Sequence, residues 1–270
     1  MPTFVRPPAV AGRFYPNNPE TLLQEIRSYT RSPGEKLRAL GCVVPHAGYM
    51  YSGHIAGAVY ARLELPKRFI ILCPNHTGIG QPLAIMSEGR WQTPLGEVRL
   101  DTALAGALKA EFPQLAEDVM AHRAEHALEV QLPFLQAQIG DFAFVPIAIG
   151  IGQFEVLEAL GEAMARVIAA EKDRPLIVTS SDMNHYESDA ITRVKDHKAI
   201  DKILALDARG LYDVVRREDI SMCGYGPAVA MLTAAKRLGA RAAQVIKYGT
   251  SGDISGDRDL VVGYAGIAVA

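Results

Sequence analysis

Residues 69–78 read FIILCPNHTG, an apolar run that stops at a proline and is followed at once by Asn75 and His76. The run from Phe69 to Cys73 shows no alternation of apolar and polar residues. This pattern is typical of a strand buried on both faces, as in a mostly parallel sheet covered by helices. Similar runs occur at residues 40–44, 142–149, 176–180, 242–248 and 260–269.

Segments with apolar residues at three- and four-residue intervals separate these runs and predict helices. They cover residues 20–29, 53–63, 101–112, 124–139, 154–170, 190–206 and 226–238. Asp101 and Ser188 or Asp189 are the expected N-caps of two of them. Residues 83–100, with TPLG at 93–96, predict an antiparallel hairpin at the sheet margin. The sequence shows no internal repeat or long linker, so we predict a single α/β domain over residues 1–270, with a mostly parallel central sheet flanked by helices.

Charge and composition argue against several classes of partner. The chain has 270 residues, with 28 Lys and Arg against 30 Asp and Glu, a formal net charge of -2. It has no block of like charges, so we expect neither a nucleic acid nor a membrane surface as partner. The longest apolar stretches, residues 142–152 and 260–270, are shorter than the roughly 20 residues of a membrane span. Pro7 and Pro8 interrupt an N-terminus without an apolar signal region, and we therefore expect a cytoplasmic protein.

Three of the 7 histidines follow the ends of predicted strands. His46 follows residues 40–44, His76 follows residues 69–73, and His185 follows residues 176–180. In an open α/β sheet, ligands bind beyond the carboxyl ends of the strands, where the loops converge. The histidines therefore indicate one shared site.

The chain has 3 cysteines, too few for a disulfide framework. Cys42 and Cys73 lie within predicted strands and are expected to be buried side chains of the core. Cys223 lies in a glycine-rich turn before a helix, where backbone N–H groups and the helix dipole favour a thiolate. Together with His46 and His76, it would bind a borderline or soft metal such as copper, zinc or iron.

Two further pairs of residues are candidates for the same site. Asp182 and His185 share one loop and are candidates for a general base or for groups that orient a metal ligand, although an aspartate here also caps turns. Glu125 and His126 line the cleft or lie on a solvated helix face. The pattern HExxH is absent around His122, which argues against a metalloprotease, and no phosphate-binding loop or GxSxG elbow is present.

Six short motifs together identify a family resemblance that extends over nearly the whole chain. They are RPPAVAGRFYP (6–16), PHAGY (45–49), PNHTG (74–78), EHALE (125–129), SSDMNHY (180–186) and CGYGP (223–227). In this order they resemble the Memo family. The resemblance implies a fold similar to that of the class III extradiol dioxygenases, which are mononuclear non-heme iron enzymes.

The resemblance also implies roles for single residues. His46, His76 and Cys223 would be ligands of one iron or copper ion. His185 would take the place of the acid/base histidine, with Asp182 beside it. Tyr49, Asn75, Glu125 and His126 would line the pocket. A cysteine stands where the dioxygenases use a glutamate ligand, and microbial members resemble proteins encoded beside radical-SAM and AMMECR-type partners.

We therefore expect a metal-dependent oxidoreductase whose substrate, a small molecule or a peptide, the sequence does not identify. Two other functions use the same residues. One is a module that binds a peptide or partner protein without catalysis, with the histidines as recognition groups. The other is metal-assisted hydrolysis of a small amide or ester, which needs the same ligands and a bound water.

Overall fold

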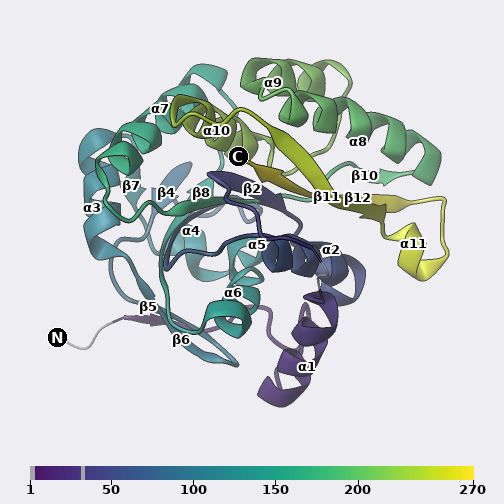
Figure 1. The fold of residues 1–270 in the computed structure, drawn as a ribbon, viewed down its shortest axis with the longest axis horizontal. Coiled ribbons are helices and arrows are strands. Elements are labelled where there is room, and N and C mark those ends of the chain that lie inside the picture. The colour runs from purple at the N-terminus through teal and green to yellow at the C-terminus, as the bar shows by residue number, and fades with distance from the viewer. Residues whose placement is uncertain (1–3, 32–33) are drawn as a thin grey trace.

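The computed structural model describes residues 4–31 and 34–270, and its central feature is a group of parallel strands (Figure 1). The strands follow the order β8-β3-β9-β2, and neighbouring strands in this group are parallel. Their bounds are β2 (Gly41–Val44), β3 (Arg68–Pro74), β8 (Ala143–Ile149) and β9 (Leu176–Ser180). Almost every residue in them is buried, which confirms the interpretation of the apolar runs.

The margins of the sheet are more mixed than the centre. Next to β2, the long strand β12 (Val261–Val269) is antiparallel to β2 and to β11 (Ala243–Thr250), and the short β10 (His185–Glu187) pairs with β12. At the other margin lie β1 (Val5–Arg6), β4 (Leu83–Ile85), β5 (Arg90–Thr93), β6 (Gly96–Leu100) and β7 (Ala116–Glu117). Within the described residues, all twelve strands belong to one mixed sheet.

The hairpin expected over residues 83–100 is only partly correct. β5 and β6 form an antiparallel hairpin around the turn at 94–95. Residues of β4 instead pair with β8 and β7. Leu83, Ala84 and Ile85 are all buried, so this segment gains more from packing on the central sheet than from extending an exposed hairpin.

Helices cover both faces of the sheet, and each face has its own apolar core (Figure 1). One face carries α1 (Pro19–Tyr29), α2 (Tyr49–Arg62), α4 (Met120–Arg123), α5 (His126–Glu129) and α6 (Leu132–Ile139). The other carries α3 (Thr102–Glu111), α7 (Phe154–Ala170), α8 (Asp189–Leu204), α9 (Ala208–Arg217) and α10 (Tyr225–Arg237). The short α11 (Gly252–Ser255) lies in the connection between β11 and β12. Across the parts of the chain described, every helix is too short or too polar to span a bilayer.

The single helix expected over residues 124–139 is wrong in one respect, because the segment forms two helices, α5 and α6. Pro133 lies in the first turn of α6, where a missing N–H is tolerated, and would break a helix that continued through it. Glu125 is the N-cap of α5, and its carboxylate accepts a hydrogen bond from the backbone N–H of Ala127. The break places Glu125 and His126 at the start of a short helix. The expected caps Asp101 and Ser188 are confirmed.

Candidate metal centre

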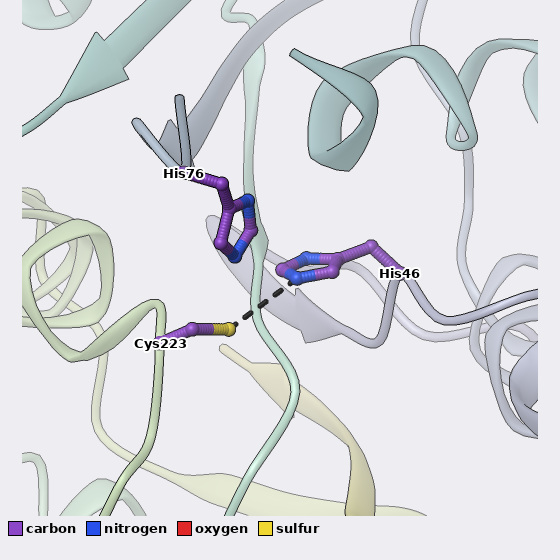
Figure 2. Close-up of side chains that lie close together, drawn as sticks. All are labelled: His46, His76 and Cys223. Carbon is purple, nitrogen blue, oxygen red and sulfur yellow. Dashed lines mark hydrogen bonds between the residues drawn. The ribbon is translucent and has the colours of Figure 1, made fainter. Parts of the chain in front are cut away.

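His46, His76 and Cys223 meet at the carboxyl end of the parallel strands (Figure 2). His46 follows β2 and His76 follows β3, and only β9 lies between these strands in the sheet. Cys223 lies just before α10. Ligand atoms of the three side chains lie within 4.8 Å of one another. The structure thus brings together residues far apart in the sequence, and their role as metal ligands remains a prediction.

The distances within this cluster suit a small metal ion. The Cys223 Sγ lies 3.3 Å from the His46 Nε2, and the two imidazole rings are 5.1 Å apart between centroids. A tetrahedral ion with metal–nitrogen and metal–sulfur bonds of roughly 2.0 and 2.3 Å would separate these two ligand atoms by about 3.5 Å. A small shift of the side chains would therefore accommodate such an ion.

Hydrogen bonds determine which nitrogen of His46 faces the cluster. The Ser180 hydroxyl donates its one hydrogen to the Ala127 carbonyl at 2.5 Å and accepts a hydrogen bond from the Gln131 side chain at 2.8 Å. The His46 Nδ1, 3.0 Å from the same oxygen, must therefore be the donor. Its Nε2 is left unprotonated and faces Cys223. Burial, followed by the charges of nearby His76 and His126, lowers the pKa of His46, so the ring is neutral.

Glu125 orients His76 in the same way. One carboxylate oxygen accepts a hydrogen bond from the His76 Nδ1 at 2.9 Å, and the other accepts one from the His76 backbone N–H at 2.6 Å. Burial on its own would raise the pKa of Glu125, but these bonds and the charge of His76 lower it to about 2. Glu125 therefore occupies the His76 Nδ1, and the Nε2 is the ring nitrogen left for a ligand. Burial on its own would lower the pKa of His76, but the hydrogen bond and the charge of Glu125 raise it.

His76, Glu125 and His126 form a second group of ligand atoms within 4.8 Å of one another. The His76 Nδ1 hydrogen already lies between that ring and Glu125. We therefore assign Glu125 to orienting His76, the common role of a carboxylate behind a metal-binding histidine. The ring of His126 stacks on His76 with centroids 4.8 Å apart and meets His46 edge-on at 5.5 Å. His126 thus lies against both candidate histidine ligands.

Asp182 lies in the loop that follows β9, and His185 is the first residue of β10. The buried Asp182 carboxylate accepts a hydrogen bond from the His46 backbone N–H at 2.8 Å, and its other oxygen lies 3.9 Å from the His46 Nε2. Burial raises the pKa of Asp182, against the hydrogen bond from the His46 backbone N–H and the charge of His185, which lower it. The His185 Nδ1 donates to the Ser221 carbonyl at 2.9 Å, so its Nε2 is free.

The three cysteines differ in their surroundings. Cys42 and Cys73 are fully buried in β2 and β3, as expected, whereas Cys223 is partly exposed. Burial, followed by the charge of Asp182, raises the pKa of Cys223. The start of α10 was expected to favour a thiolate. Without a bound cation this is wrong, because burial raises the pKa of the Cys223 thiol more than the hydrogen bonds from backbone N–H groups lower it.

Tyr49 and Asn75 lie next to the cluster, but their side chains bond elsewhere. The Tyr49 hydroxyl donates to the Val130 carbonyl at 2.6 Å, and its ring packs on Phe134. The Asn75 side chain bonds to Thr77, Gly78 and Ile79, which shapes the loop after His76. Both residues therefore support the backbone around the site.

A buried ion pair that the sequence analysis did not assign holds the segment with Glu125 and His126. Arg6 and Glu129 are almost completely buried, and their side chains are joined by a 2.6 Å contact. Arg6 also donates to the carbonyls of His122 and Glu125, each at 2.8 Å, and Glu129 accepts from Tyr15 at 2.6 Å. Arg6 and Tyr15 lie in the motif at residues 6–16, and Glu129 lies in the motif at residues 125–129. These family motifs were the sequence signal that could have identified the buried pair.

Comparisons with known proteins bear on the family. A family model described as Memo-like protein matches residues 6–268. A MEMO1 family protein of Methanosarcina mazei is 44% identical over 98% of this chain and 99% of its own length. Similar relatives from Pyrobaculum aerophilum and Archaeoglobus fulgidus are each 44% identical over 97% of this chain and 98% of their own. The resemblance expected from the six motifs is thereby confirmed.

Proposed function

The chain belongs to the Memo-like protein family, and from this we propose that it holds one iron or copper ion with His46, His76 and Cys223 and uses it in a redox reaction. The observation that carries the proposal is the convergence of two imidazole nitrogens and a thiol within 4.8 Å of one another. Two imidazoles and a thiolate favour a borderline or soft transition metal over Mg²⁺ or Ca²⁺, which prefer oxygen ligands.

Two residues near the candidate ligands are suited to accept and release a proton. A bound iron or copper ion would supply one-electron chemistry. Asp182 is a candidate to hold a proton beside the ligands, because burial raises its pKa. His185 offers its free Nε2, because its Nδ1 is bonded to the Ser221 carbonyl. We propose that these two groups accept and return a substrate proton.

The relationship to class III extradiol dioxygenases is part of this proposal. It is supported by the position of the candidate ligands after parallel strands of an α/β sheet. Cys223 differs from the carboxylate of a 2-His-1-carboxylate iron site, and this difference bears on which metal binds and on which reaction follows.

Metal binding tests the proposal directly. We expect protein purified without chelators, or reloaded with Fe²⁺ or Cu²⁺, to contain about one equivalent of metal per chain by elemental analysis. Cys223→Ser should weaken binding at least about tenfold, whereas Cys73→Ser, at a buried position in β3, should leave it unchanged. Less than roughly 0.1 equivalent, with no uptake on addition, would overturn the proposal.

The reaction class needs a separate experiment. The same ligands with a bound water would hydrolyse a small amide or ester. Oxygen consumption by the metal-loaded protein, compared with release of amine from model amides, separates the two chemistries. Oxygen uptake that Cys223→Ser abolishes supports a redox reaction, and amide cleavage without oxygen uptake contradicts it.

A further inference from the structure

We propose that Ser221 is a positioning residue that ties His185 to the loop of Cys223 and fixes which nitrogen of His185 faces the site. The inference rests on the proposed function, because it treats His185 and Cys223 as parts of one site. Ser221 has no role in the family motifs considered above, and it precedes Cys223 by only two positions.

Ser221 binds His185 through both its side chain and its backbone. Its Oγ accepts a hydrogen bond from the His185 backbone N–H at 2.7 Å, and its carbonyl oxygen lies 2.9 Å from the His185 Nδ1. A carbonyl only accepts hydrogen bonds, so the Nδ1 must carry the hydrogen. The Nε2 is therefore the nitrogen left free for a proton.

A second set of bonds connects Ser221 to the interior. The Asn184 side-chain oxygen accepts from the Ser221 backbone N–H and from its hydroxyl, each at 3.1 Å. Asn184 is fully buried, and its own backbone N–H donates to the Asp196 carboxylate at 2.8 Å. The Ser221 hydroxyl thus accepts a hydrogen bond from the His185 backbone N–H and donates one to the Asn184 side chain. Together with the bond from Asn184 to Asp196, these hydrogen bonds connect helix α8, residues 184–185 and residues 221–223.

The sheet alone holds His185 weakly. β10 has only three residues, and its pairing with β12 is irregular between His185 and Glu187. Between them, Tyr186 has a φ of 60° in the left-handed region, although it is not glycine, and its side chain is exposed. Such backbone persists where surrounding contacts hold it. The bonds from Ser221 add to the pairing with β12 and hold both the backbone and the ring of His185.

Nitrogen NMR of the histidine side chains, recorded at fixed pH without metal, tests the inference. His185→Gln identifies the His185 signals. We expect the wild-type His185 to show the Nδ1–H tautomer. Ser221→Ala keeps the carbonyl but loses the hydroxyl bonds to the His185 backbone N–H and to Asn184 that hold this carbonyl against the His185 Nδ1, so we expect a mixture of tautomers. Ser221→Thr keeps a hydroxyl and should restore the wild-type signal. Ser188→Ala removes another serine hydroxyl, the N-cap of α8, and should lower stability while leaving the His185 tautomer unchanged.

Co²⁺ affinity supplies a second measurement, because a bound Cys223 thiolate gives a charge-transfer band. We expect Ser221→Ala to weaken Co²⁺ binding about tenfold and Ser221→Thr to recover it. An unchanged tautomer in Ser221→Ala, or the same change in Ser188→Ala, would overturn the inference. Because the tautomer is measured without metal, a protein that binds no metal but passes the NMR test would contradict only the proposed function.

Discussion

At the scale of single residues, the cluster depends on hydrogen bonds that hold the imidazole rings from behind. Glu125→Gln provides a test, because the amide is nearly the same shape but carries no charge to hold the His76 Nδ1 hydrogen. We expect metal affinity to fall by about 10- to 100-fold, the usual effect of losing such a carboxylate. Isothermal titration with Zn²⁺ measures this. Glu155→Gln, at a side chain that is 79% exposed, is the control, and equal affinities for both variants would contradict the assignment of Glu125.

His122 predicts a dependence of stability on pH. Both of its ring nitrogens are buried, and within the described residues neither makes a well-formed hydrogen bond. Burial, followed by the charge of Arg6, lowers the pKa of His122 from 6.5 to about 4. The unfolded chain therefore binds this proton more readily than the folded chain. The contribution of neutral His122 to stability is complete above pH 6.5 and is lost as the pH falls through 4.

Urea unfolding between pH 7 and pH 4 measures this contribution. His122→Phe keeps a buried ring without a titrating group, so we expect the variant to lose about 3 kcal/mol less than the wild type across this range. His197→Phe, at an exposed position, should follow the wild type. Parallel curves for wild type and His122→Phe would show that His122 does not titrate in this way.

The sequence identified the candidate ligands and Glu125, which orients His76, but not the residues that orient His46. His46, His76 and Cys223 could be predicted because strand ends, prolines and glycines are local signals. Ser180 and Gln131 could not, because a serine at the end of a strand and a glutamine between two helices are ordinary locally. Their importance arises only where the chain brings them to His46.

At the scale of elements, strand β1 is fastened to helix α5 by the buried pair of Arg6 and Glu129. Removing one partner leaves the other charge buried and unpaired. We therefore expect Glu129→Gln to lower the free energy of unfolding by about 3–5 kcal/mol. As a control, Glu64→Gln breaks the exposed pair with Arg38, in which the Arg38 side chain is 92% exposed and the Glu64 side chain 52%. This substitution should lower the free energy of unfolding by less than about 1 kcal/mol. Similar losses in the two variants by urea unfolding would contradict this account.

The limits of sequence-based prediction are also visible in the elements. The long apolar strands and the amphipathic helices carry strong periodic signals and were predicted. The strands β1, β7 and β10 have two or three residues each, too few for a periodic pattern, and pair only because distant segments lie beside them. Helix α9 was not predicted, although its buried residues Leu211, Val214 and Val215 lie at the three- and four-residue intervals of a helical face.

At the scale of the whole molecule, the candidate ligands join segments from opposite ends of the chain, since His46 and Cys223 are 177 positions apart. A ligand that binds only the folded state stabilises the whole fold. At a free metal concentration about 100 times Kd, the expected gain is about 2.7 kcal/mol. For a chain of this size, such a gain raises Tm by roughly 5–10 °C.

This stabilisation should increase with pH. Burial raises the pKa of Cys223, so the thiol is protonated before metal binds and releases its proton on binding. Affinity therefore rises about tenfold per pH unit while the free thiol stays protonated. Calorimetry with and without Zn²⁺ at pH 6, 7 and 8 should show a Tm increase that grows with pH in the wild type and in Cys73→Ser. Cys223→Ser should lose most of the increase and the part of its pH dependence that comes from the thiol proton, while His76, whose pKa Glu125 raises, still releases a proton at the lower pH values. A wild-type shift that is the same at each pH, or a shift unchanged in Cys223→Ser, would show that another group binds the metal.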